Sequence, residues 1–178
     1  MEKYFCGGSG AKQSQEKLNI TLINITKLLN NSSLSNWFIA YGTLLGIIRD
    51  NNTIDGDDDV DIIIDIKYKE KLLHLLKENN YILTHNMPNF LKTKENSEFS
   101  SIDFYLSDVN NDGNYNDTWN GVIWSNCYND KKKLIKYNWS NIELQIPNNY
   151  KSKLINRYGD TWYIKQDTKG PTPHKKII

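Results

Sequence analysis

The strongest chemical signal in the chain is the acidic run Asp57-Asp58-Asp59-Val60-Asp61, which leads directly into Ile62-Ile63-Ile64. An apolar, β-branched segment of this kind is typical of a central strand. Because side chains alternate across a strand, Asp57, Asp59 and Asp61 project to one face in steps of about 7 Å. Carboxylates gathered in this way repel one another at neutral pH unless a hard divalent cation neutralises them. The run therefore predicts a site for magnesium, or for manganese.

A further carboxylate stands where a core residue is expected. Residues 99–106 predict another strand, and Asp103 lies in it between Ile102 and Phe104. If this strand is a neighbour of the acidic strand, Asp103 completes the metal site. The competing interpretations are a solvated acidic loop for residues 57–59 and a satisfied or edge-exposed carboxylate for Asp103. The pairing of the two strands decides between them.

The turn Gly42-Thr43 follows a short apolar strand and precedes a helix start. Bare N–H groups and a hydroxyl at a helix N-terminus favour anions, so a phosphate fits here. A purely structural turn is the competing interpretation. Arg49, one of only two arginines, lies between this turn and the acidic strand. It either pairs with a phosphate or forms a surface salt bridge.

These residues need elements that position them, and hydrophobic periodicity predicts those elements. Helices are expected at 13–30, 44–49, 67–79 and 150–158, the last ending at Gly159. Strands are expected at 37–40, 57–65, 81–84, 90–93, 99–106 and 142–146. The order of these segments predicts a mixed sheet flanked by helices, an α+β fold.

Residues 107–137 are rich in Asn and Asp and predict a long irregular insertion. Residues 108–113 match the first half of an EF-hand calcium loop, but the twelfth position is Trp119 rather than Glu, so a turn-rich loop is favoured. Trp119, Trp124 and Tyr128 either stack on a sugar or base, hold a quaternary ammonium group, or form a local core. The local core is favoured.

The chain has 178 residues and a mass of 20.8 kDa, enough for one sizeable core. We therefore expect a single domain over residues 1–178, with its core at about 13–165 and a loose tail at each end. The 22 Lys and Arg residues against 21 Asp and Glu leave a net charge of +1. This balance provides no global basic field for nucleic acid, so any charge-driven function is local.

No apolar run approaches the roughly 18 to 20 residues of a membrane span, and the N-terminus lacks a secretory apolar core. We expect a cytoplasmic protein. Cys6 and Cys127 have no CxxC spacing and His74, His85 and His174 are scattered, which disfavours zinc and a disulfide framework. The 24 Asn, 21 Ile and 20 Lys against two Arg indicate AT-rich coding, as in a giant virus, a protist or an AT-rich bacterium.

Residues 37–49, WFIAYGTLLGIIR, together with the acidic strand that follows them, resemble the LicD family of bacterial phosphocholine transferases, fukutin and fukutin-related proteins. Residues 157–162, RYGDTW, are similar to the closing motif of that family. The resemblance spans about residues 37–162 and implies a nucleotidyltransferase fold, which is a mixed sheet flanked by helices.

The resemblance also implies roles for the residues singled out above. Asp59 and Asp61 are the metal-binding Asp-x-Asp pair, and Asp103 is the third carboxylate. Asp57 supports the site, and the Gly42-Thr43 turn holds the donor phosphate.

The implied activity is the magnesium-dependent transfer of a phosphorylated alcohol, such as phosphocholine or ribitol phosphate, from a CDP-linked donor to a glycan hydroxyl. Two alternatives stand beside it. One is a nucleotidyltransferase that uses an NTP and releases pyrophosphate, because the same metal site serves both reactions. The other is a non-catalytic module that binds a metal ion or a nucleotide.

Overall fold

The computed structural model describes residues 11–165, and Cys6, His174 and nearly all of the predicted tails lie outside this range. The helices are α1 (Gln15–Asn30), α2 (Tyr41–Asp50), α3 (Lys69–Glu78) and α4 (Tyr150–Tyr158), with a 3-10 turn η1 (Ile66–Tyr68) before α3. The strands are β1 (Trp37–Ile39), β2 (Asp59–Asp65), β3 (Leu83–Met87), β4 (Phe90–Thr93), β5 (Ser101–Val109), β6 (Tyr115–Asp117), β7 (Val122–Trp124), β8 (Ile135–Trp139) and β9 (Ile142–Ile146).

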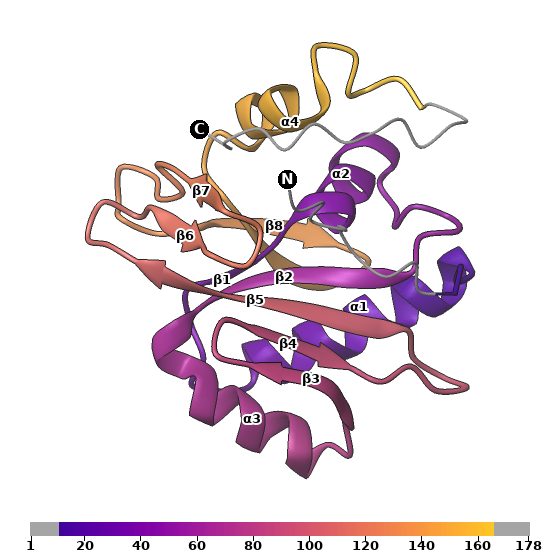
Figure 1. Cartoon of the computed structure of the whole chain (residues 1–178). Helices are drawn as coiled ribbons and strands as arrows, with labels where there is room; N and C mark the ends of the chain where they lie inside the picture. Colours follow the sequence, from indigo (N-terminus) through magenta and orange to yellow (C-terminus); the bar gives the residue numbers. More distant parts are fainter. Residues whose placement is uncertain (1–10, 166–178) are drawn as a thin grey trace, which may run out of the picture.

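One large sheet carries the strand order β1-β2-β5-β4-β3, and β6 and β7 extend it from the end of β5 (Figure 1). Strands β2 and β5 run parallel, whereas the neighbouring pairs are antiparallel. A parallel pair needs a crossover connection, which α3 and the β3–β4 hairpin supply. Strands β8 and β9 form a separate two-stranded sheet. The predicted mixed sheet is confirmed.

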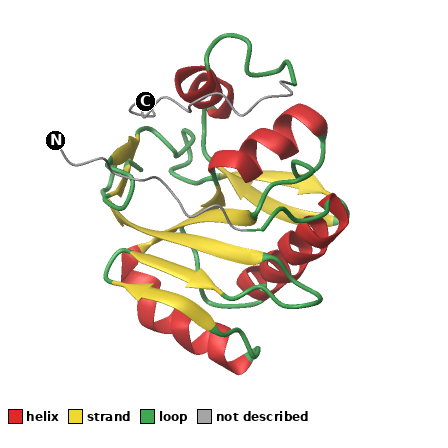
Figure 2. Ribbon diagram, turned by 45° about the vertical axis from the view of Figure 1, so that its right-hand side comes forward, coloured by secondary structure: helices red, strands yellow, loops and turns green. Residues whose placement is uncertain are grey.

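Helices cover the two sides of the sheet. Figures 1 and 2 show α1 and α3 on one side, and α2 and α4 on the other. Helix α1 begins where the Ser14 side chain accepts a hydrogen bond from the Lys17 N–H group, at 3.3 Å. Its apolar stripe is fully buried at Leu18, Leu22, Ile25 and Leu29. The 3.6-residue period of this stripe was visible in the sequence, and the helix is a packing helix as predicted.

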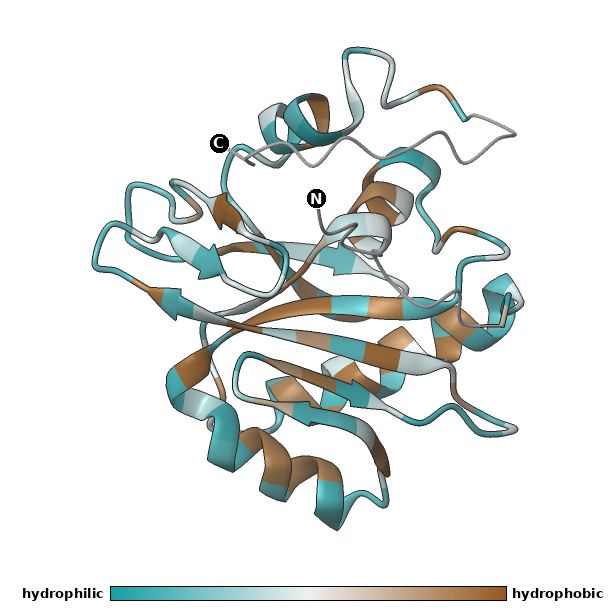
Figure 3. Cartoon of the chain, in the orientation of Figure 1, coloured by the Kyte–Doolittle hydropathy of each residue, from teal (hydrophilic) through white to brown (hydrophobic). Residues whose placement is uncertain are grey.

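Strand β2 is the centre of the core. Val60, Ile62 and Ile64 are fully buried on one of its faces, and Ile63 is fully buried on the other. Asp61 is only 7% exposed although it is a carboxylate. Figure 3 shows hydrophilic bands interrupting the hydrophobic colour of this strand. The acidic run is therefore not a solvated loop at Asp61, because the strand carries that residue into the interior.

Two predictions need correction. Helix α2 begins at Tyr41 rather than at residue 44, because the Tyr41-Gly42-Thr43 turn is itself the first turn of the helix. Residues 107–137 are not irregular throughout, since they contain the end of β5, the β6–β7 hairpin and the start of β8. These strands are short and separated by turns rich in Asn, Asp and Gly, which concealed their alternation. The EF-hand half-match forms the β5–β6 turn, where the Asn110 side chain accepts from the N–H groups of Asp112 and Asn114.

Candidate active site

The parallel pairing of β2 with β5 brings the predicted carboxylates together. Asp61 lies opposite Asp103 in the register, and Asp59 lies opposite Ser101. Because Asp59 and Asp61 are two residues apart on one strand, they share a face of the sheet, and Asp103 lies on that face beside Asp61. The structure therefore contains the pairing of the acidic strand with the Asp103 strand that the predicted site requires.

Asp61 is held on all sides by hydrogen bonds. Its Oδ1 accepts from the Tyr105 hydroxyl at 3.0 Å, and its Oδ2 accepts from the Gly42 N–H at 3.1 Å. Its own N–H donates to Thr43 Oγ1 at 2.8 Å. Gly42 and Thr43, at the start of α2, thus fix the position of Asp61 relative to the helix N-terminus.

Lys92 on β4 is a site residue that sequence reasoning missed. Its Nζ lies 2.6 Å from Asp103 Oδ1 and 3.0 Å from Asp59 Oδ2, so one ammonium joins two of the three carboxylates. The β4–β5 register places Lys92 opposite Asp103. A lysine between Leu91 and Thr93 in a short apolar strand was the available signal. Among 20 lysines that signal was not distinctive.

Burial and mutual repulsion shape the charges of this cluster. Burial raises the pKa of Asp61 well above its usual range, and the charges of Asp59, Asp57 and Asp103 add to the rise. Burial, with the charge of Asp59, raises the pKa of Asp103 to about 8 despite the opposing effect of Lys92. Burial lowers the pKa of Lys92, but the charges of Asp59 and Asp103 outweigh it and raise that pKa overall. The cluster therefore favours added positive charge.

The chemistry of these donors fits a hard divalent cation, which prefers carboxylate oxygens. As the side chains stand, no three His, Cys, Asp or Glu residues within 11–165 are grouped so as to hold a metal ion. The geometry explains this, because Lys92 Nζ lies between Asp59 and Asp103 while Asp61 bonds to Gly42 and Tyr105. Metal binding at these carboxylates stays a prediction.

Gly42 is needed for the close approach of α2 to the acidic strand. A Cβ atom at this position would lie 2.7 Å from Asp57 Oδ2 and 3.5 Å from Asp61 Oδ2. The first distance is shorter than real Cβ contacts, so any other residue would push Asp57 aside. Asp57 therefore lies beside Asp61 at the N-terminus of α2, where the sequence predicted it.

Tyr41 links the site to the β6–β7 hairpin, a role that no pattern in the sequence indicates. Its φ angle is 43°, an uncommon conformation for a bulky residue. Its hydroxyl donates to Asp117 Oδ2 and accepts from Asn120 Nδ2 at 3.3 Å. Its ring packs edge-on against Tyr105, with centroids 4.9 Å apart, next to the residue that bonds Asp61.

Arg49 is the predicted site residue that the fold does not bring to the carboxylates. It lies in the last turn of α2, about 10 Å along the helix from Gly42. Its Nε and Nη2 donate to the Asp50 carboxylate at 2.9 and 2.7 Å. These contacts match the salt-bridge interpretation.

Comparison with known families identifies the domain. The family described as LicD/FKTN/FKRP, nucleotidyltransferase domain, matches residues 35–158, which include β1, α2, the acidic strand, Asp103 and α4. The chain belongs to the LicD family. No match was found among curated protein sequences.

Solved structures support the fold of this LicD domain. The lincomycin-bound lincosamide antibiotic adenylyltransferase LnuA is similar with a TM-score of 0.56 and 17% identity, over 78% of this chain and 82% of that one. The antibiotic-resistance factor ANT(2'')-Ia in solution is similar with a TM-score of 0.55 and 11% identity, over 74% and 66% of the two chains. A crystal structure of ANT(2'')-Ia with adenylyl-2''-tobramycin gives 0.51 and 12%, over 72% and 68%. The predicted nucleotidyltransferase fold is confirmed.

The aromatic residues of the 107–137 segment divide into two groups in the LicD domain. Trp124 is buried between Phe38 and Tyr41, and the Tyr128 ring packs edge-on against Tyr115. These contacts match the predicted local core. Trp119 is different, because it remains 45% exposed while its ring stacks on Phe90 at 4.4 Å.

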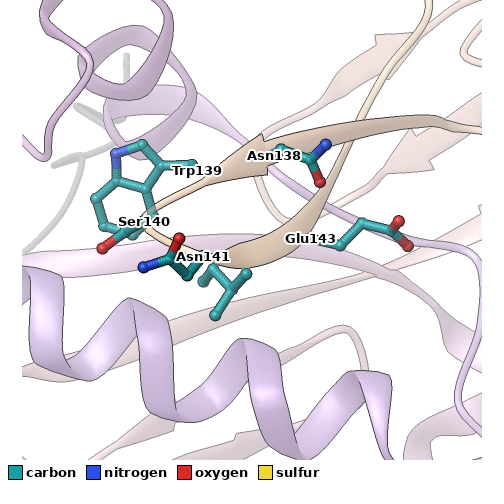
Figure 4. A pocket seen from close by; sticks show the side chains of 6 residues that line it. Asn138, Trp139, Ser140, Asn141 and Glu143 are labelled. Atoms are coloured by element: carbon teal, nitrogen blue, oxygen red, sulfur yellow. The ribbon is translucent and has the colours of Figure 1, made fainter.

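A hollow of about 590 Å³ lies at the turn of the β8–β9 hairpin, and Figure 4 shows its lining. It is lined by Asn138, Trp139, Ser140, Asn141, Ile142 and Glu143. Ser140 and Asn141 both have positive φ, as a tight two-residue hairpin turn requires. The charged lining residue, Glu143, is paired with Lys136. The hollow thus offers no catalytic group, and the candidate active site of the LicD domain is the carboxylate cluster.

No helix within the described residues is long and apolar enough to cross a membrane.

Proposed function

We propose that this LicD domain is a magnesium-dependent transferase that moves a phosphorylated alcohol from a CDP-linked donor to a glycan hydroxyl. Membership of the LicD family and the nucleotidyltransferase fold support a transferase of nucleotide or phosphate groups. The observation that carries the proposal is the convergence of Asp59, Asp61 and Asp103 on one face of paired parallel strands. Such an arrangement is suited to holding a divalent cation against a phosphate.

In the proposed reaction, the acceptor oxygen attacks the phosphorus that bears the alcohol. A new P–O bond forms there, the P–O bond to the bridging oxygen breaks, and CMP leaves with that oxygen. Asp103 would either help to hold the metal ion or, ionised beside that ion, accept the proton of the attacking hydroxyl. Asp59 and Asp61 would hold the metal ion with Asp57 in support. When bound, that ion supplies positive charge for the attacking and leaving oxygens.

The residues around the carboxylates orient them for this chemistry. Gly42 and Thr43 fix Asp61 at the N-terminus of α2, where backbone N–H groups also favour the donor phosphate. Tyr105 holds the other oxygen of Asp61. This double restraint sets the direction of the carboxylate before a substrate binds.

Trp119 supports the acceptor side of the proposal. It stacks on Phe90, which lies opposite Tyr105 in the β4–β5 register, two residues along β4 from Lys92. Because residues two apart on a strand share a face, Phe90 and Lys92 lie on one face of the sheet. An aromatic ring that is half exposed near the carboxylates offers an apolar platform on which a sugar ring can pack.

Phosphorus NMR of the purified protein with magnesium and either CDP-choline or CDP-ribitol tests the proposal. We expect CMP to appear, even as slow transfer to water, and Asp59→Asn to abolish its release. Silence with both donors would contradict the CDP-linked donor. Pyrophosphate release from an NTP would then establish the nucleotidyltransferase alternative, and binding without turnover would establish the non-catalytic one.

A further inference from the structure

Arg157, in the last turn of α4, is half-buried and has two guanidinium nitrogens without a hydrogen-bond partner. Its Nε and Nη1 atoms are inaccessible to solvent and have no hydrogen-bond partner among the described residues. Buried N–H groups of a charged side chain are normally paired, because leaving them unpaired is energetically unfavourable. These two N–H groups are therefore free to donate to an oxyanion.

The guanidinium lies over the side chain of Tyr41, the first residue of α2. Its central carbon is 4.4 Å from the centre of the Tyr41 ring and 5.9 Å from that of Tyr158. Tyr41 directly precedes Gly42, whose N–H donates to Asp61. Figure 1 shows α4 next to α2 on the same side of the sheet. Arg157 thus lies against the first residue of α2, next to the residue whose N–H group bonds Asp61.

Electrostatics agree with this placement. Burial raises the pKa of Tyr158 to about 12, and the charges of Asp61 and Asp57 add to the rise while Arg157 opposes it. Arg157 also opposes the rise in the pKa of Tyr41, which is caused first by burial and then by Asp117. The Arg157 charge therefore acts on the same small region as the carboxylates of the acidic strand.

We propose that Arg157 binds a phosphate of the diphosphate donor, with its guanidinium positioned by Tyr41. A guanidinium presents its N–H donors in a planar fork that matches two phosphate oxygens, and it stacks favourably on an aromatic face. A phosphate at this point also lies beside the N-terminus of α2. This inference rests on the proposed function for the identity of the donor, and it replaces Arg49 with Arg157 as the arginine that holds the donor phosphate.

Calorimetric titration of the protein with CDP-choline and, separately, with inorganic pyrophosphate tests this inference, both with magnesium present. We expect Arg157→Gln to weaken the binding of both probes roughly 10- to 100-fold, because charge-assisted hydrogen bonds to phosphate are lost. Arg157→Lys should recover part of the affinity, since it restores the charge without the planar fork. Lys151→Gln is the matched control, because it removes an exposed charge from the same helix.

Several outcomes would overturn the inference. Unchanged affinity in Arg157→Gln, or loss of affinity in Arg49→Gln instead, would do so, as would a wild-type protein that binds neither probe. A lower melting temperature in Arg157→Lys with full affinity for both probes would show a structural role only. If the wild type releases no CMP but Arg157→Gln still loses pyrophosphate binding, the proposed function fails while the phosphate contact of Arg157 stands.

Discussion

Two lysine–carboxylate pairs of nearly equal length lie in opposite environments of this protein. In the large sheet, Lys92 Nζ is 2.6 Å from Asp103, with side chains 20% and 10% exposed. In the β8–β9 hairpin, Lys136 Nζ is 2.7 Å from Glu143, with side chains 73% and 42% exposed. The N···O distance therefore does not distinguish the two pairs, whereas the exposure of their side chains does.

The difference lies in what each carboxylate would face without its lysine. Glu143 would be solvated by water, so the hairpin pair is expected to contribute little to stability. Asp103 would remain buried beside Asp59 and Asp61, with charges that repel one another. Lys92 thus offsets part of the repulsion within the acidic cluster. A buried cluster of like charges does not favour stability, and such clusters are typical of functional sites.

The largest effect is expected from Asp61→Asn in the acidic cluster. It keeps the shape of the side chain and removes the charge, so CMP release should fall at least about 1000-fold while the circular dichroism spectrum remains unchanged. Asp108→Asn is the control, because Asp108 is an exposed carboxylate later on β5. Comparable activity in Asp61→Asn and Asp108→Asn would show that the buried and exposed acids do not differ in function.

Lys92→Met should lower the free energy of unfolding of the metal-free protein by about 3 kcal/mol, because it leaves buried carboxylates without their cation. Urea denaturation measures this change. Magnesium should restore more stability to Lys92→Met than to the wild type, since the ion then binds without displacing the ammonium. An equal response to magnesium in both proteins would refute the competition between Lys92 and the ion.

The metal-free protein should lose stability as the pH rises through neutrality. Unfolded carboxyl groups release their protons near pH 4, whereas Asp61 and Asp103 retain theirs to higher pH because their pKa values are raised in the fold. Their contribution to stability is complete below about pH 4 and is lost as the pH approaches 8. We expect the melting temperature with EDTA to be about 5 °C lower at pH 8 than at pH 6. Asp61→Asn should reduce that difference, and a difference that is unchanged in this variant would assign the effect to other groups.

Gly42→Ala should place a methyl group 2.7 Å from Asp57 Oδ2 and displace the acidic strand from α2. We expect a loss of about 1 kcal/mol in stability and a clear drop in CMP release. Gly121→Ala is a useful comparison for stability, because a Cβ at Gly121 meets nothing within 4 Å and only the strain of its φ of 65° remains. Normal turnover in Gly42→Ala would mean that the close approach of α2 is not needed for activity.

Lys136→Met should have the smallest effect, below about 0.5 kcal/mol in urea denaturation, because its partner Glu143 becomes solvated. CMP release should be unchanged. If Lys136→Met destabilised the protein as strongly as Lys92→Met, burial would not be the property that separates the two pairs.

Local patterns in the sequence were enough to predict the acidic strand, the α1 stripe and the Gly42-Thr43 turn, because periodicity and turn chemistry depend on neighbouring residues. The LicD motifs lie in the same segments. Asp103 could be proposed from its place in a second strand, although its proximity to Asp61 depended on a pairing that a sequence does not state. The short strands β6 and β7 were missed because turn-forming residues dominate that segment.

The sequence by itself therefore determined the family and the order of the main elements, and it predicted the carboxylates of the candidate site. Only the tertiary structure decided which cations face those carboxylates. Lys92 reaches them through the antiparallel pairing of β4 with β5, whereas the placement of α4 beside α2 brings Arg157 against the Tyr41 ring. Arg49 is closer to the acidic strand in the chain, but the helix carries it about 10 Å away from Gly42. Charges act through space, and distance along the chain does not report distance in space.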